Sequence, residues 1–203
     1  FDGKDDYVTA GGFSFSANAP KTYSVWFKSS TVAGRTILNH VGVSHMVYLY
    51  FSGSTTLQSW MNGGPASFTI PSAADNQWHQ LTYVYTGTAE RLFFDGVQAG
   101  SDNVEASPAA SSSTLYIGSA STIEFWNGSI DEVRIWNRSL SQDEVTQLYQ
   151  SSLKKFGPNE TLEWTNSSSF GNFSSSIKST NGLDWEILIN QSGLVVGESY
   201  DYN

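Results

Sequence analysis

Asp131 is the acidic residue whose position most strongly suggests a chemical role. It lies at the start of a predicted strand, after a glycine turn, with Ile130 and Val133 as its apolar neighbours. A carboxylate in such a place needs an ion pair, hydrogen bonds or a bound metal to offset the loss of water. The sequence leaves three interpretations open: an ion pair with Arg134, a turn cap, or a cation ligand.

Residue patterns typical of catalysis are weak. No Gly-x-Ser-x-Gly nucleophile elbow occurs, and His40, His45 and His79 lack the close spacing of a metal site. Asp184 and Glu186 are the nearest approach to the paired carboxylates of a glycosidase. The sequence therefore predicts a protein that is not an enzyme, with glycoside hydrolase as a less favoured alternative.

Aromatic and amide side chains could instead form a carbohydrate site. Glycan-binding proteins stack sugar rings on exposed Trp or Tyr, and their amides and carboxylates form hydrogen bonds with the sugar hydroxyl groups. The residues predicted to reach the rim of the fold are His45, Tyr48, Trp60, Asn62 and Trp126. The alternative for each aromatic residue is a place in the core, which we prefer for Trp78 together with its neighbour His79.

N-glycosylation signals concentrate in the later part of the chain. The Asn-x-Ser/Thr pattern occurs at Asn127, Asn137, Asn159, Asn166, Asn172 and Asn190. The alternative is a chain rich in Asn and Ser that carries no glycan. Glycans at these sites would place the protein outside the cytosol, so we predict an extracellular or cell-surface location.

Composition excludes several classes of partner. The chain has 203 residues, a formal net charge of −9 and no cysteine, so disulfides and thiolate metal sites are excluded. The negative net charge argues against nucleic acid as a binding partner. No apolar run reaches the ~20 residues of a membrane-spanning helix, so we expect no membrane insertion. No signal peptide is recognisable, and we expect a processed or partial chain because it begins with Phe1.

Short alternating segments predict an all-β fold. The expected strands cover residues 23–28, 36–40, 46–51, 57–61, 78–85, 90–95, 97–100 and 115–118. The single expected helix begins near Ser141, which has capping-box spacing with Glu144. Its apolar stripe includes Val145 and Leu148, and we expect it to end by Ser152.

Five segments, taken in order, resemble laminin-G-like, concanavalin A-like jelly-roll domains. These segments are residues 1–8, 78–85, 92–96, 115–118 and 125–141. The resemblance implies a two-sheet antiparallel jelly-roll sandwich over residues 1–150, closed by one short C-terminal helix. The Glu-x-Asp-x-x-Glu pattern of the glucan hydrolases with this fold is absent.

The same resemblance implies a structural calcium ion. Domains of this shape often hold Ca²⁺ where the first and closing strands meet, which points to Asp131 and Asp2, with backbone carbonyls near residues 33–34. Calcium prefers six to eight hard oxygen ligands, many of them carbonyls. The alternative is that Asp5 and Asp6 are solvated turn residues and that no ion binds.

Residues 151–203 are predicted to form a small β-rich extension or a truncated second domain. Strand-like segments at 162–164, 183–189 and 194–196 lie between loops rich in Asn and Ser. They are too apolar for a disordered linker but too short to bury themselves. We therefore expect contacts with the first domain or with another chain, which would permit self-assembly.

The favoured function is an extracellular, non-catalytic recognition or adhesion module that binds a glycan or a surface protein. This prediction rests on analogy at the level of the fold. The alternative is a structural subunit of a glycosylated surface layer or an extracellular filament, which the extension favours.

Overall fold

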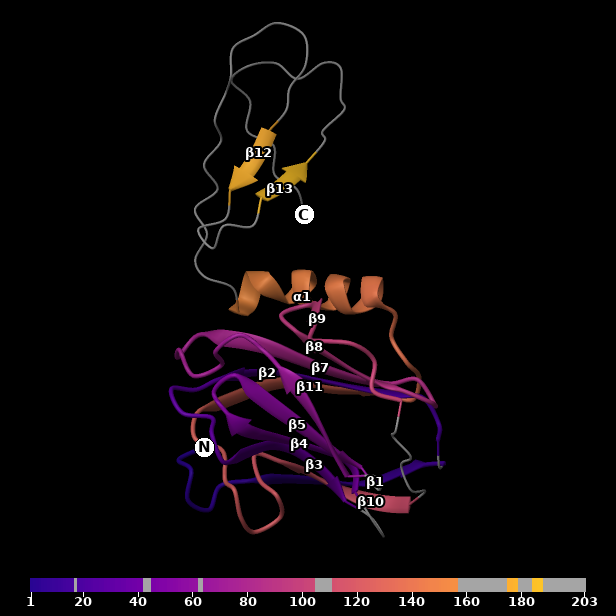
Figure 1. Ribbon diagram of the computed structural model, residues 1–203. Helices are drawn as coiled ribbons and strands as arrows, with labels where there is room; N and C mark the ends of the chain where they lie inside the picture. Colours follow the sequence, from indigo (N-terminus) through magenta and orange to yellow (C-terminus); the bar gives the residue numbers. More distant parts are fainter. Residues whose placement is uncertain are drawn as a thin grey trace, which may run out of the picture. The chain divides into compact units, whose positions relative to one another are not determined.

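The computed structural model describes residues 1–16, 18–41, 45–61, 64–104, 111–156, 175–178 and 184–187. The chain divides into two compact units, Phe1–Phe156 and Gly157–Asn203. The first unit consists of two antiparallel sheets and one helix (Figure 1). The predicted jelly-roll sandwich is therefore confirmed.

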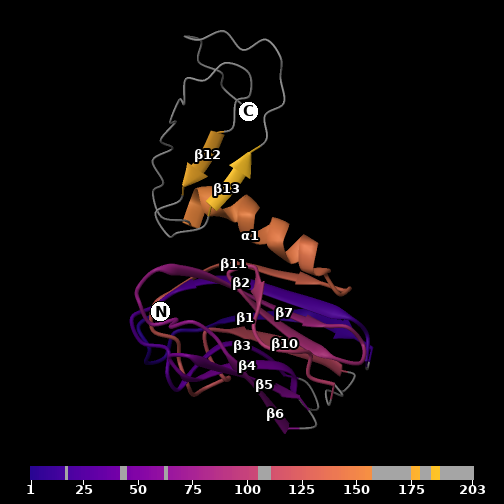
Figure 2. The same ribbon diagram turned by 45° about the horizontal axis from the view of Figure 1, so that its top comes forward.

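One sheet has six strands and the other has five. In spatial order the six-stranded sheet contains β1 (Val8–Phe15), β10 (Ser111–Ile117), β3 (Arg35–Val41), β4 (His45–Gly53), β5 (Thr56–Met61) and β6 (Gly64–Thr69). The five-stranded sheet contains β11 (Ser129–Trp136), β2 (Lys21–Lys28), β7 (Trp78–Tyr85), β8 (Glu90–Phe94) and β9 (Val97–Gln98). Early strands thus pair with late ones, and the two sheets form stacked layers (Figure 2).

The main core lies between the two sheets. Alternate side chains of each strand point into it, among them Val25 and Phe27 of β2 and Leu49 and Phe51 of β4, all at most 1% exposed. Each such side chain contributes about 1.5–3 kcal/mol relative to an exposed one. On the opposite face of the six-stranded sheet Thr36 and Asn39 of β3 are buried, whereas Tyr48 and Tyr50 are half-buried and Trp60 is 36% exposed, so these rings remain available to a ligand.

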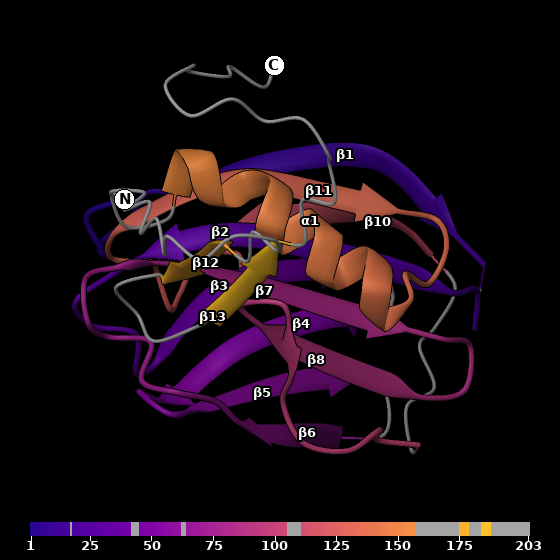
Figure 3. The same ribbon diagram turned by 90° about the horizontal axis from the view of Figure 1, so that it is seen from above.

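Helix α1 (Gln142–Phe156) covers the outer face of the five-stranded sheet (Figure 3). The predicted capping box is confirmed: the backbone N–H of Ser141 donates to Glu144 Oε2 at 2.8 Å, and the N–H of Glu144 donates to Ser141 Oγ at 3.2 Å. Within the described part of the chain, no helix has the length and apolar character needed to cross a membrane.

The predicted end of the helix at Ser152 is wrong, because α1 continues to Phe156. Ser152 is itself buried and lies on the same side of the helix as the apolar stripe. One turn later the Phe156 ring stacks on Trp26 at 4.6 Å and lies 4.9 Å from Trp78. These long-range contacts stabilise the last turn.

In the second unit the structure describes two antiparallel strands. They are β12 (Ser175–Lys178) and β13 (Asp184–Ile187), with Ile177 opposite Trp185. The strand predicted at 183–189 is therefore found in part. The segments 162–164 and 194–196 lie outside the described residues, and the predicted contacts of this unit stay a prediction.

Candidate ligand-binding face

A row of side chains crosses the outer side of the six-stranded sheet. Strand register aligns Tyr116 of β10 with Asn39 of β3, Asn39 with Tyr48 of β4, and Tyr48 with Trp60 of β5. Because successive side chains along a strand point to opposite faces, these paired residues share the outer face of the sheet. Their neighbours along each strand point into the core. We call this surface, together with the neighbouring Tyr50, the aromatic face.

Tyr48 contacts two other rings of the aromatic face, those of Tyr50 and Trp60. Tyr48 stacks on Tyr50, with centroids 5.9 Å apart and planes 25° apart, and its ring lies 6.3 Å from Trp60. Trp60 keeps 36% of its surface exposed. At the other end, Tyr7, which is 45% exposed, packs against Tyr116 at 5.9 Å. Such a surface presents flat apolar rings beside polar groups.

Glu124 adds a carboxylate to this face from the loop before β11. Its Oε2 accepts hydrogen bonds from Thr36 Oγ1 at 2.7 Å and from the Tyr48 hydroxyl. Its backbone carbonyl also accepts from the N–H of Thr36 at 3.0 Å. Burial and the bond to Glu124 raise the pKa of Tyr48 well above its usual value, so the phenol remains a donor. The carboxylate is thereby fixed in position.

The structure brings together only some of the residues predicted to bind a ligand. Tyr48 and Trp60 are neighbours on the aromatic face. Asn62 lies outside the described residues, and only the backbone of His45, in β4, is described. The assignment of Trp126 to the rim is wrong, because this residue is completely buried.

The burial of Trp126 has a direct cause in packing. Its ring lies 5.5 Å from Phe27 and 5.6 Å from Phe51, one from each sheet, so it fills the space between the layers. The glycine turn that follows it suggested a loop at the rim. The turn is present, but the side chain points inward.

Sequence reasoning missed four members of this site: Asn39, Tyr50, Tyr116 and Glu124. The alternation in β4 could have placed Tyr50 on the same side as Tyr48. Nothing local could have revealed Glu124, because its partner Tyr48 is 76 positions away in the sequence.

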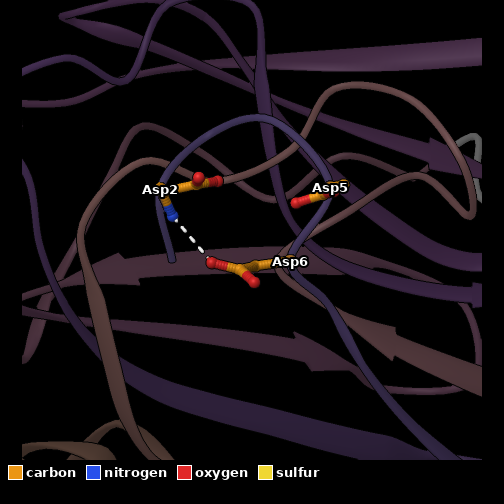
Figure 4. Close-up of side chains that lie close together, drawn as sticks. All are labelled: Asp2, Asp5 and Asp6. Carbon is orange, nitrogen blue, oxygen red and sulfur yellow. Dashed lines mark hydrogen bonds between the residues drawn. The ribbon is translucent and has the colours of Figure 1, made fainter.

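The residues predicted to bind calcium lie in different surroundings. Asp2 is grouped with Asp5 and Asp6, three exposed carboxylates within 4.8 Å of one another (Figure 4). The backbone N–H of Asp2 donates to Asp6 Oδ2 at 3.0 Å. This acidic group is suited to a hard cation, but exposed acidic groups also occur without one. Calcium binding here stays a prediction.

Asp131 does not belong to that acidic group. Its Oδ2 forms an ion pair with Lys155 Nζ at 3.1 Å, and its Oδ1 accepts from the backbone N–H of Glu132 at 2.7 Å. The alternative partner considered from sequence, Arg134, pairs instead with Glu132 at 2.6 Å. The carboxylate of Asp131 thus has partners without a metal.

His79 lies between two carboxylates, a feature that the sequence did not reveal. Its Nδ1 is 2.8 Å from Asp95 Oδ2, and its Nε2 is 3.0 Å from Asp75 Oδ1. Asp95 and Gly96 both have positive φ, as the favoured Asp-Gly hairpin turn requires. Asp95 Oδ1 also accepts from the N–H of Gln80 at 2.7 Å. The arrangement ties β7 to this turn, which fits the structural role expected for His79.

Two of the predicted glycosylation sites lie in the described part. Asn137 is exposed. Asn127 is half-buried and packs so closely on Gly3 that a Cβ there would lie 2.9 Å from the Asn127 side chain. The remaining sites, at Asn159, Asn166, Asn172 and Asn190, lie outside the described residues.

A separate hollow of about 360 Å³ lies beside α1. An ion pair between Arg138 and Glu144, at 2.8 Å, lies at this hollow. Its lining consists of Trp136, Arg138, Leu140, Glu144, Gln147, Leu148 and Ser151.

Comparison with known proteins identifies a family and a fold. A family model described as the concanavalin A-like lectin/glucanases superfamily matches residues 2–146. No curated protein matches the chain. The heptameric SAP-like pentraxin of Limulus polyphemus is similar in structure, with a TM-score of 0.60 and 16% identity over 93% of this chain and 90% of that chain.

Two further solved structures share the fold. Domain 4 of an extracellular arabinanase from Geobacillus stearothermophilus, solved with arabinotriose, has a TM-score of 0.54 and 18% identity, over 73% of this chain and 86% of that chain. The binding domain of botulinum neurotoxin serotype D has a TM-score of 0.59 and 16% identity, over 75% of this chain and 41% of that chain.

Proposed function

Because the chain belongs to the concanavalin A-like lectin/glucanase superfamily, we propose that it is a non-catalytic module that binds a glycan on its aromatic face. The observation that carries the proposal is the row Tyr116–Asn39–Tyr48–Trp60 across four neighbouring strands. It places rings that can stack on sugars beside Glu124, whose carboxylate can bind hydroxyls, while Asn39 itself is only 2% exposed.

The length of the row indicates the size of the ligand. Neighbouring strands lie about 4.8 Å apart, so the row from β10 to β5 spans roughly 14 Å. That length supports an oligosaccharide rather than a single sugar residue. Rings that are already held by their neighbours lose little conformational freedom when a ligand stacks on them, which favours binding.

The distribution of carboxylates supports a binding role rather than hydrolysis. The six strands of this sheet contain no Asp or Glu. Glu124, from the adjoining loop, therefore has no carboxylate partner on these strands. Most glycosidases need two carboxyl groups that flank the scissile bond. We accordingly propose recognition without catalysis.

An extracellular or cell-surface location is part of the proposal. The exposed sequon at Asn137 supports it. In that location the module would serve attachment or recognition. Self-assembly through residues 151–203 stays a separate prediction.

A glycan array tests the proposal, with the wild-type chain compared with Trp60→Ala. We expect the variant to lose at least about tenfold in affinity, the equivalent of about 1.4 kcal/mol, because the most exposed ring of the row is removed. Val97→Ala is the control, since Val97 is 70% exposed on the other sheet. Circular dichroism checks that both variants fold. No glycan bound by the wild type, or equal binding by Trp60→Ala, would refute the proposal.

A further inference from the structure

We propose that the aromatic face selects neutral glycans and rejects those with carboxylate or sulfate groups, and that Glu124 sets this selectivity. The inference rests on the proposed function. It starts from the charges that surround the face, because a charged ligand needs a complementary group and is disfavoured by a like one.

The strands beneath the face offer no cation to an acidic sugar. They contain no Lys, and Arg35 of β3 is their single Arg. Arg35 pairs in register with Phe51, a core residue, and so lies on the opposite side of the sheet from Tyr48. Its Nη1 donates to the carbonyls of Gly3 at 3.0 Å and Phe125 at 2.7 Å. Its guanidinium is therefore already bound to the backbone.

The other Lys and Arg residues of the first unit lie in the N-terminal loop, on the five-stranded sheet, or in and just before α1, where Arg138, Lys154 and Lys155 are found. Lys21 is completely buried on β2, and Lys28 lies at the end of the same strand, in the other sheet. Arg91 and Arg134 are paired with Asp102 and Glu132 respectively. Lys4 lies in the N-terminal loop and pairs with Asp2 at 3.9 Å. The loop segments that the structure leaves out between residues 17 and 110 contain no Lys or Arg.

The negative charge, in contrast, lies where a ligand would sit. Glu124 Oε2 accepts hydrogen bonds from Thr36 and Tyr48, so the carboxylate is held against the outer side of the sheet. An ionised carboxylate has about four acceptor sites, so it can also accept a hydrogen bond from a sugar hydroxyl. An acidic substituent in the same place would meet a fixed carboxylate without a counter-charge.

The exposed acidic group near the other end of the face adds to this effect. Asp5 and Asp6 directly precede Tyr7, whose ring packs on Tyr116. Asp2, Asp5 and Asp6 lie close together, and Lys4 offsets only part of their charge (Figure 4). The acidic group near Tyr116 and the carboxylate bonded to Tyr48 therefore both favour a ligand without negative charge.

The test measures binding of matched neutral and acidic oligosaccharides to the full chain. Suitable pairs are lactose with 3′-sialyllactose, and mannotriose with trimannuronate, extended to acidic and neutral partners of any glycan that the array identifies. We expect each acidic partner to bind at least about tenfold more weakly than its neutral counterpart at low salt. The difference should shrink as salt is added, because screening shortens the reach of the carboxylate.

Glu124→Gln tests the role of the carboxylate itself. The carboxamide oxygen can still accept from Thr36 and Tyr48, so the face keeps its shape. We expect the neutral-to-acidic ratio to fall at least about threefold, mainly through better binding of the acidic partner. Asp143→Asn is the control, since it removes the same charge from an exposed position in the first turn of α1. The ratio of neutral to acidic oligosaccharide affinity in this variant should match that of the wild type.

Three results would overturn the inference. Equal affinity for both members of each pair would refute the selectivity while leaving glycan binding intact. An unchanged ratio in Glu124→Gln would refute the role of this residue. No binding of any oligosaccharide would refute the proposed function, and the selectivity with it.

Discussion

Replacement of Phe156 by Ala tests whether the last turn of α1 is part of the folded core. Phe156 is 6% exposed, and its ring lies 4.6 Å from Trp26 and 4.9 Å from Trp78. A helix that ended by Ser152, as the sequence suggests, would place this residue in a linker where the substitution has little effect. The structure predicts a large loss of stability instead.

The size of the loss follows from burial. Phe→Ala substitutions in protein cores cost about 3–5 kcal/mol, and a position at the end of a helix, where neighbours can relax, favours the lower value of about 3 kcal/mol. For a chain of 150–250 residues each kcal/mol lowers Tm by about 2–4 °C. We therefore expect Phe156→Ala to lower Tm by about 6–12 °C.

Thermal unfolding followed by near-UV circular dichroism measures this loss, because the signal reports packed tryptophans. Gln147→Ala, on the exposed side of the same helix, is the matched control, and its effect should stay within about 0.5 kcal/mol. A loss below about 1 kcal/mol in Phe156→Ala would refute the packing of the last turn.

Three further predictions concern charged groups. Burial lowers the pKa of Lys21 from 10.5 to about 8, so the unfolded chain binds more protons between these values and stability should rise with pH there; Lys21→Met should abolish that rise in urea titrations, and an unchanged pH profile would contradict this. Burial opposes the positive charge of His79, but the hydrogen bonds of its ring to Asp95 and Asp75 outweigh burial and raise its pKa above 6.5. The stability that the protonated His79 contributes is complete below pH 6.5 and is lost as the pH rises through its higher folded pKa. His79→Gln should therefore flatten the loss of stability above pH 6.5, and an equally steep loss in the variant would count against the ion pair. Asp131→Ala should lower Tm only slightly, because the pair with Lys155 is largely exposed, and equally with and without a calcium chelator; dependence on chelator in the wild type but not in the variant would indicate a metal at Asp131.

Much of the fold could be predicted because it depends on local patterns. Alternation in segments such as 78–85 indicated strands, and the spacing of Ser141 and Glu144 located the start of α1. The order of the segments also suggested the family, which the match over residues 2–146 confirms. The end of α1 could not be predicted, because it depends on Trp26, which is distant in the sequence.

The ligand-binding face could be predicted only in part, for the same reason. Tyr48 and Trp60 were proposed from residue type and strand position, and register brings them together. Trp126 has the same residue type as Trp60, and only the packing of both sheets shows that it is core. The position of Glu124 depends on a loop fixed to β3 through Thr36, which no local pattern encodes.

The most direct test of glycan binding at the aromatic face is a crystal structure of the full chain with the neutral oligosaccharide that binds best on the array. We expect sugar rings stacked on Trp60 and Tyr48, with a hydroxyl hydrogen-bonded to Glu124. An oligosaccharide bound only in the hollow beside α1, or only at the acidic group around Asp2, would contradict this account.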